Sequence, residues 1–197
     1  MSLELSTLRK TLRQQRRRVN VFQHRQTEHK VLNQLRQSQH FKSAQHIGVY
    51  LHAFGEVHTH HIILECFSLG KKVYLPKICN MNQCLQWVQI SQRQYLNRRF
   101  AHHPLGMKEP MVARGVHVRH LDVLLMPLLA CDLLGTRIGM GGGYYDRTLA
   151  HALQRPIRLG LAHDFQYIST PLYRNPWDQA LDGLITPSKS YVFRRFW

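Results

Sequence analysis

The residues most able to do chemistry lie in one short segment, Arg137–Arg147. It reads Arg-Ile-Gly-Met-Gly-Gly-Gly-Tyr-Tyr-Asp-Arg and comes shortly after the strongly apolar run Leu121–Met126. Glycines adopt backbone conformations that other residues avoid, and they leave main-chain N–H groups open to an oxygen anion. The segment therefore predicts a loop that binds phosphate. On glycine content alone, a flexible surface turn before a helix is the alternative.

Charged residues at the ends of this loop fit the same chemistry. Arg137 and Arg147 flank it, and a helix expected to begin near Tyr145 would point the positive end of its dipole at the loop. Asp146 stands where a carboxylate could hold Mg²⁺ against phosphate oxygens, or where an acid simply favours a first helical turn. The loop is not a Walker A motif, because no lysine and Ser/Thr follow its last glycine. It is not a dinucleotide fingerprint either, because Tyr144 stands in place of the third glycine.

Alternating strands and helices are expected to position the loop. Leu121–Met126, the most apolar strand, should be central, Cys84–Ile90 should be an antiparallel addition, and Pro76 should end its strand. The pattern predicts one α/β domain over residues 1–197, with a mostly parallel sheet and helices on both faces. The expected strands are Ile47–Leu51, Val73–Leu75, Cys84–Ile90, Leu121–Met126, Ile157–Ala162 and Gly183–Thr186, and the expected helices between them are His60–Leu69 and Tyr145–Gln154.

The N-terminal region is strongly basic. Ten of the 27 lysines and arginines fall within the first 42 residues, against two acids, Glu4 and Glu28, and the leucine spacing predicts two helices there. Arginines of the first helix recur at i, i+4, i+7 and i+8 from Arg9, so they share one face. Further along, residues 97–120 are predicted to form a long surface connection.

The net charge of +16 predicts affinity for polyanions. The partner could be nucleic acid or a small, heavily anionic ligand, and a basic surface without a specific partner is the third possibility. A basic polyanion-binding module without turnover remains the rival hypothesis, although no nucleic-acid-binding motif is present. No apolar run approaches the ~20 residues that span a bilayer, so no membrane partner is expected. Four cysteines without zinc-site spacing indicate free thiols in a cytoplasmic protein.

Several other polar residues have an ordinary structural interpretation. Glu56 after a strand is by default a solvated turn residue, although its place at a strand's carboxyl end favours ligand contact. Asp182 is by default a turn residue before a strand. His163 followed by Asp164 could form an acid–base pair, but a strand-end polar contact is expected. Five histidines could suggest a metal, but they lack zinc spacing and are expected to be scattered on the surface; they are His58, His60, His61, His102 and His103.

The glycine-rich block resembles the signature of the 5-formyltetrahydrofolate cyclo-ligase family, also called 5,10-methenyltetrahydrofolate synthetases. The similarity extends over nearly the whole chain and in the right order. It includes Leu8–Arg17, Val49–Glu56 with Thr59, Lys72–Pro76, Asp122–Pro127, Asp132, Gly135, Arg137–Arg147, Leu161–Asp164 and Trp177–Ser188.

The resemblance implies an ATP- and Mg²⁺-dependent ligase that closes 5-formyltetrahydrofolate to 5,10-methenyltetrahydrofolate and yields ADP and phosphate. Phosphorylation turns the formyl oxygen into a leaving group, and the neighbouring N10 then attacks within the same molecule. The enzyme must mainly align the γ-phosphate with that oxygen and neutralise its charge. The folate could carry a polyglutamate tail.

The resemblance also implies roles for individual residues. Glu56, Arg137 and Tyr144 are the candidate catalytic residues, and Asp146 and Asp182 the candidate Mg²⁺ ligands. The implied ATP contacts are Arg9, Arg13, Arg137, Gly139, Gly141, Gly142, Gly143, Tyr144 and Tyr145, and the implied folate contacts are Leu51, Glu56, Met140, Gly141, Gly142, Gly143 and Tyr144.

Overall fold

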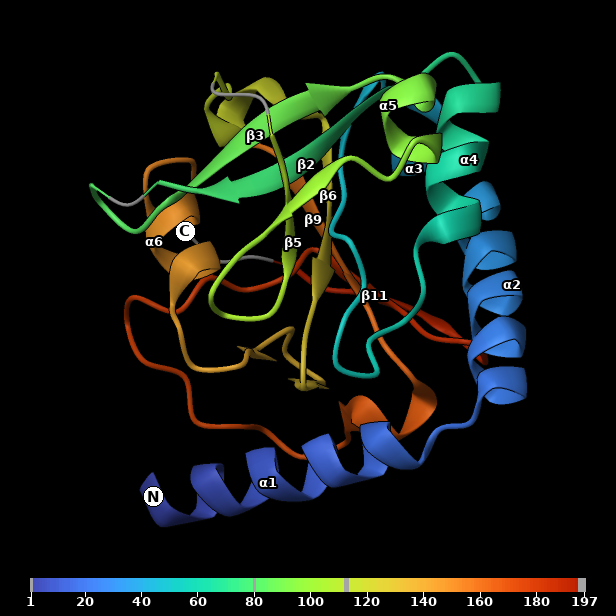
Figure 1. Cartoon of the computed structure of the whole chain (residues 1–197). Coiled ribbons are helices and arrows are strands. Elements are labelled where there is room, and N and C mark those ends of the chain that lie inside the picture. The colour runs from blue at the N-terminus through green and yellow to red at the C-terminus, as the bar shows by residue number, and fades with distance from the viewer. Residues whose placement is uncertain (1, 80, 112–113, 195–197) are drawn as a thin grey trace.

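The computed structural model describes residues 2–79, 81–111 and 114–194. Its elements alternate along the chain (Figure 1). The helices are α1 (Ser2–Arg18), α2 (Val21–Gln37), α3 (Gln39–Ser43), α4 (His60–Ser68), α5 (Gln92–Leu96) and α6 (Tyr144–Ala150), with 3-10 turns η1 (Val118–His120) and η2 (Asp164–Gln166). The strands are β1 (His46–Gly48), β2 (Lys72–Ile78), β3 (Leu85–Ile90), β4 (Phe100–His102), β5 (Lys108–Pro110), β6 (Val123–Pro127), β7 (Ala130–Asp132), β8 (Arg137–Ile138), β9 (Ile157–Leu161), β10 (Tyr167–Ile168), β11 (Gly183–Ile185) and β12 (Ser190–Val192).

The main sheet has seven strands in the order β12-β11-β9-β6-β1-β2-β3. The five inner strands run parallel, and β3 and β12 are antiparallel edges. The central position of β6 and the antiparallel addition of β3 are as predicted. A parallel sheet needs cover on both faces because its strands are apolar on both.

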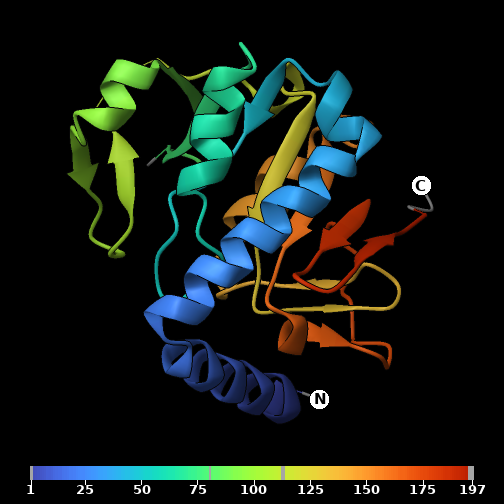
Figure 2. The same ribbon diagram turned by 90° about the vertical axis from the view of Figure 1, so that its right-hand side faces the viewer.

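Helices provide that cover on each face, so the predicted fold class is confirmed. One core cluster packs α2, α3 and α4 against the sheet, and the other packs η1 and α6 against the opposite face. Figure 2 shows α2 lying across the sheet, with α1 at its lower end. Asn20 separates these two predicted basic helices, because its side chain caps α2 in a reciprocal bond with Gln23.

Pro76 does not end its strand, contrary to the prediction. It pairs with Trp87, whose N–H and C=O bond Val116 and therefore point away from β2. On the other side, β1 has already ended, since its last pair is Gly48 with Tyr74. A proline that lacks an N–H costs no ladder bond at this position.

Two further predictions differ from the structure. The helix expected to reach Gln154 ends at Ala150, and the carbonyl of Ala152 accepts a bond from the buried guanidinium of Arg158 at 3.0 Å. The surface connection expected at 97–120 contains a β4–β5 hairpin. This hairpin is anchored by Glu109, a buried carboxylate that accepts the Ile78 N–H at 2.9 Å.

A small sheet, β10-β7-β8, was not predicted, and it carries the glycine-rich loop. Buried Asp132 fixes the turn before β8 by accepting the N–H groups of Leu134 and Thr136, and it also accepts the N–H of Leu172. Leu12 of α1 packs against this small sheet. The sheet therefore joins α1 to the loop that follows Ile138.

All four cysteines are free thiols, as predicted. Within the described ranges, no helix combines the length and the apolar character needed to cross a membrane.

Candidate functional site

The glycine-rich loop leaves β8 and turns into α6 with a backbone that requires glycine. Gly141 has φ +106° and Gly143, the N-cap of α6, has φ +66°, values that other residues rarely adopt. A Cβ at Gly139 would lie 2.8 Å from the Arg137 guanidinium, and one at Gly142 would lie 2.7 Å from the Tyr144 ring. The glycines therefore bring the loop backbone close to two neighbouring side chains.

Arg137 and Asp146 join the two ends of the loop. Nη2 of Arg137 lies 2.9 Å from both carboxylate oxygens of Asp146, and the guanidinium also lies over the Tyr145 ring at 5.4 Å. The Gln179 N–H donates to Asp146 at 3.1 Å. The structure thus brings together Arg137, Tyr145 and Asp146, as expected for one site.

Two arginines of α1 contact the loop from the other side. Arg13 donates to the Met140 carbonyl at 2.9 Å. Arg16 is buried; it donates to the Leu128 carbonyl at 3.4 Å and contacts the Met140 sulfur at 3.4 Å. Arg9 is half-buried on the same helix. Arg16 was not among the predicted site residues, although its spacing of seven from Arg9 placed it on their face.

These arginines and Arg137 have N–H donors that no described residue uses. Among the described residues, Arg9, Arg13, Arg16 and Arg137 each have a buried Nε–H without a hydrogen-bond partner. Buried cationic donors favour an anionic acceptor, and phosphate oxygens suit the guanidinium fork. The residues present therefore fit a polyphosphate.

Glu56 lies at the same place, reached by the chain that leaves β1. Its carboxylate accepts the Ala53 N–H at 3.0 Å and lies 3.8 Å from the Arg16 guanidinium, with only 11% of the side chain exposed. Burial raises its pKa to about 7, although the Ala53 N–H and Arg16 both favour the ionised form. Burial and the Glu56 charge together raise the pKa values of Tyr50 and Tyr145, so Glu56 lies within electrostatic range of the start of α6.

Other predicted contacts flank this centre. Leu51 is half-buried against the core beside Tyr50, and Met140 is exposed at the loop tip. Tyr144 is half-buried, with the Arg147 guanidinium 5.1 Å from its ring centre. Arg147 also donates to the Gly142 carbonyl at 2.7 Å. Arg147 therefore holds the end of the loop that leads into α6.

The two predicted Mg²⁺ ligands have different surroundings. Asp146 lies in the first turn of α6, whereas Asp182 directly precedes β11 and accepts the Arg158 N–H at 2.7 Å. No group of three or more His, Cys, Asp or Glu side chains in the described ranges is placed to hold a metal. Mg²⁺ usually takes one or two carboxylates plus water and phosphate oxygens, so Asp146 fits such an ion. Both assignments stay predictions.

The prediction of scattered surface histidines is wrong for His58 and His60, which are half-buried in specific contacts, whereas the side chain of His61 is 44% exposed. His58 stacks on His24 and His52, His60 bonds the Tyr95 hydroxyl at 2.8 Å, and His61 pairs with Glu28 at 2.9 Å. These contacts bring together α2, α4, α5 and the segment after β1, which no local spacing could reveal. His102 and His103 lie on the exposed β4–β5 hairpin.

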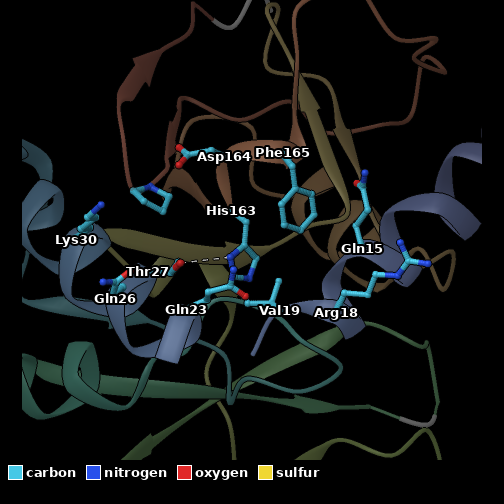
Figure 3. Close-up of a pocket in the computed structure, with 11 residues that line it drawn as sticks. Gln15, Arg18, Val19, Gln23, Gln26, Thr27, Lys30, His163, Asp164 and Phe165 are labelled. Atoms are coloured by element: carbon cyan, nitrogen blue, oxygen red, sulfur yellow. Dashed lines mark hydrogen bonds between the residues drawn. The ribbon is translucent and has the colours of Figure 1, made fainter. Parts of the chain in front are cut away.

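One described surface hollow lies elsewhere. It has a volume of about 440 Å³ and is lined by the α1–α2 corner and by the segment that follows β9 (Figure 3). Of the residues that line it, none belongs to the predicted site. His163 at its wall bonds Gly55 and Thr27, and Asp164 bonds Ser188, so the two make separate strand-end contacts rather than an acid–base pair.

A mostly parallel sheet with a basic glycine loop and a buried carboxylate at its carboxyl edge defines an α/β enzyme. The chain belongs to the 5-formyltetrahydrofolate cyclo-ligase family, whose sequence model matches residues 2–187. This confirms the predicted family and its ligase class.

Individual relatives agree. The chain is 35% identical over 150 residues to the 5-formyltetrahydrofolate cyclo-ligase of Escherichia coli (strain K12), covering 73% of this chain and 78% of that protein. It is 30% identical over 185 residues to the Haemophilus influenzae protein of the same name, covering 90% and 95%. The solved 5,10-methenyltetrahydrofolate synthetase of Aquifex aeolicus superposes with a TM-score of 0.82 at 27% identity, covering 98% of this chain and 94% of that one.

Proposed function

We propose that this chain closes 5-formyltetrahydrofolate to 5,10-methenyltetrahydrofolate with ATP and Mg²⁺, releasing ADP and phosphate, and that it also accepts polyglutamylated folate. The observation that carries the proposal is the placement of the glycine-rich loop. The loop lies between arginines of α1 and Arg137, beside a buried carboxylate, in a member of the cyclo-ligase family. Such a site can hold a polyphosphate on one side and a polar organic substrate on the other.

The loop and its arginines hold the nucleotide phosphates. Main-chain N–H groups of Gly139 to Gly143 provide donors without side-chain obstruction, and Arg9, Arg13 and Arg137 provide positive charge with unused Nε–H donors. Tyr144 and Tyr145 line the start of α6. Positive charge fixed before the reaction stabilises the charge that builds up on the transferring phosphoryl group.

Glu56 orients the formyl and pterin end of the folate. With a pKa of about 7, it changes protonation near neutral pH and can accept from or donate to a folate nitrogen. Leu51, Met140 and Tyr144 supply apolar contact area around it. Glu56, Arg137 and Tyr144 are the residues we assign to catalysis.

Asp146 and Asp182 are the proposed Mg²⁺ ligands. When bound, the ion would neutralise phosphate oxygens during transfer. Arg137 holds Asp146 in place through the bidentate contact, and it competes with the ion for the same oxygens. Mg²⁺ should therefore enter together with the phosphates, which give Arg137 a new partner.

The charge of α1 also bears on the rival hypothesis of polyanion binding. Arg13 and Arg16 point at the loop and at Glu56, so part of the +16 charge serves an internal site. We propose a small anionic substrate as the main partner, in a single-domain protein of the cytoplasm. The test is the ultraviolet band of methenyltetrahydrofolate in a mixture of protein, Mg·ATP and 5-formyltetrahydrofolate. Absence of the band, with salt-sensitive RNA binding instead, would favour the rival.

A further inference from the structure

Four histidine rings form a continuous column beside the loop that carries Glu56. His52 stacks on His58 with ring centres 4.1 Å apart, and His58 stacks on His24 at 4.3 Å with planes 6° apart. His163 meets His24 edge-on at 5.3 Å and stacks on Phe165. We call His52, His58, His24 and His163 the imidazole column.

The column connects three separate parts of the chain. His52 and His58 belong to the segment after β1 and lie four residues before and two residues after Glu56. His24 belongs to α2, and His163 follows β9 (Figure 3). His163 Nε2 lies 3.2 Å from the carbonyl oxygen of Gly55, the residue before Glu56. The column therefore contacts the Glu56 loop at its start, its middle and its end.

The hydrogen bonds of the outer rings fit neutral imidazole. His52 Nδ1 accepts the backbone N–H of Thr59 at 3.3 Å, and the Thr59 hydroxyl donates to the Tyr50 carbonyl. If His52 Nδ1 carried a proton, its N–H would face the N–H of Thr59, and neither group could accept a hydrogen bond from the other. His163 can donate from Nε2 to Gly55 only if that nitrogen carries the proton, which leaves Nδ1 to accept from the Thr27 hydroxyl at 3.4 Å.

The charged groups that face the column compensate a positive ring only in part. From α1, Arg16 acts on His163 as a like charge. From α2, Glu28 is the anion that acts on His24, His52 and His58. Its carboxylate already accepts the backbone N–H of His61 and lies 2.9 Å from His61 Nδ1. From α4, His60 acts on His52 as a like charge. In addition, His24 Nδ1 is buried without a partner within the described residues.

We propose that the imidazole column is a positioning device for Glu56, which holds the 50–59 loop closed only while its rings are neutral and releases it on acidification. Because release of the loop would move Glu56, the column would make the proposed ligase activity sensitive to acid. This consequence rests on the proposed function of Glu56. Stacked neutral rings gain apolar and quadrupole contact, whereas neighbouring cations at this spacing repel.

The sign of the pH effect follows from the direction of the shifts. Burial lowers the pKa of His52 and of His163 to about 4, and it lowers the pKa values of His24 and His58. An opened loop has ordinary histidines near 6.5, so the open state binds more protons below that pH. Closure is therefore stable above pH ~6.5 and weakens as pH falls toward 4. At pH 5, one ring shifting from 4 to 6.5 raises the opening equilibrium about 30-fold.

Hydrogen exchange of the ligand-free protein at pH 7.5 and 5.0 tests this directly, with rates corrected for intrinsic exchange. The wild type should lose at least about tenfold in protection at residues 50–59 at pH 5.0, while β6 keeps its protection. His58→Phe keeps a stacking ring without a proton site, and His163→Gln keeps a donor for Gly55, so each should lose less protection than the wild type, which carries all four titratable rings. The matched control is His40→Gln, because His40 is exposed on α3, and it should behave as wild type.

His163→Phe separates positioning from simple packing. It removes the donor to Gly55 and should expose the 50–59 loop at both pH values, with a lower kcat that His163→Gln restores at pH 7.5. Equal protection of the wild-type loop at both pH values would overturn the proposal, and so would an equal acid loss in His58→Phe. If the loop opens at pH 5.0 but the protein has no cyclo-ligase turnover, the proposed function is contradicted. The proposal that the column controls the loop would still hold.

Discussion

Nη1 of Arg16 lies 3.8 Å from Oε1 of Glu56, while Nη2 of the same side chain lies 3.4 Å from the sulfur of Met140. One buried arginine therefore touches both the glycine-rich loop and the carboxylate proposed to contact folate. The main chain of Arg16 also lies against Gly55, where an added Cβ would come within 2.8 Å of the Arg16 carbonyl oxygen. This contact couples the phosphate side of the site to the folate side.

Arg16→Met should weaken both sides of the site at once. Loss of the cation removes a stabilising charge from Glu56 and raises the pKa of that carboxyl further above 7. We expect kcat/KM to fall at least ~10-fold, and the pH profile to move toward alkaline pH, because removing one member of a buried pair leaves the other uncompensated. Arg17→Met is the matched control, since Arg17 is exposed on the same helix. A normal pH profile in Arg16→Met would contradict the coupling.

Glu56→Gln should change how stability depends on pH. Because the folded-state pKa of Glu56 is raised, its contribution is present below the ordinary value near 4.5 and is lost as pH rises through about 7. The wild type should therefore lose thermal stability relative to Glu56→Gln between pH 5.5 and 8. Thermal unfolding at matched ionic strength measures the difference. Parallel curves would show that the carboxyl is ionised throughout this range.

Gly141→Ala should impair nucleotide binding through backbone strain alone. Gly141 has φ +106°, yet a Cβ there meets no atom within 4 Å. We expect a destabilisation of about 1–2 kcal/mol and a raised KM for ATP. Gly70→Ala is the control, since Gly70 at the end of α4 has φ +69° and the same open space. It should cost similar stability and leave the KM for ATP unchanged; an equal effect of both variants on that KM would refute a role for the loop.

Asp146→Asn and Asp182→Asn test the metal assignment. Asparagine at 182 keeps an oxygen acceptor for the Arg158 N–H, so β9 and β11 should still pair. Each variant should raise the Mg²⁺ concentration for half-maximal activity about tenfold or more, because each removes a charged oxygen ligand. The measurement is activity against free Mg²⁺ at saturating ATP. An Asp182→Asn protein with unchanged Mg²⁺ dependence would restrict the site to Asp146.

Much of the fold was predictable because its signals are local. An apolar run such as Leu121–Met126 indicates a buried strand whatever its neighbours are. The glycine block indicates a loop from its own residues alone. Two features were not predictable. The continuation of β2 through Pro76 depends on where β1 ends, and the β10-β7-β8 sheet depends on the bond from the distant Leu172 N–H to Asp132. Local sequence does not contain those partners.

In the candidate site, too, the local features were predictable and the long-range contacts were not. The spacing of Arg9, Arg13 and Arg16 predicted a shared helical face, but only the packing of α1 on the small sheet directs Arg16 toward Glu56. The imidazole column is the extreme case. Its four rings come from three parts of the chain, and no two of them stand at a helical or strand spacing that predicts their contact.

The most direct measurement is the stoichiometry of the proposed reaction. Purified protein is mixed with Mg·ATP and 5-formyltetrahydrofolate, and the methenyltetrahydrofolate band and released phosphate are followed together, with Asp146→Asn in parallel. We expect one phosphate for each methenyl product in the wild type, and both at a much lower rate in the variant at the same limiting Mg²⁺ concentration. Phosphate release without the band, or the band without ATP, would contradict the proposal that this loop presents a γ-phosphate to the formyl oxygen of folate.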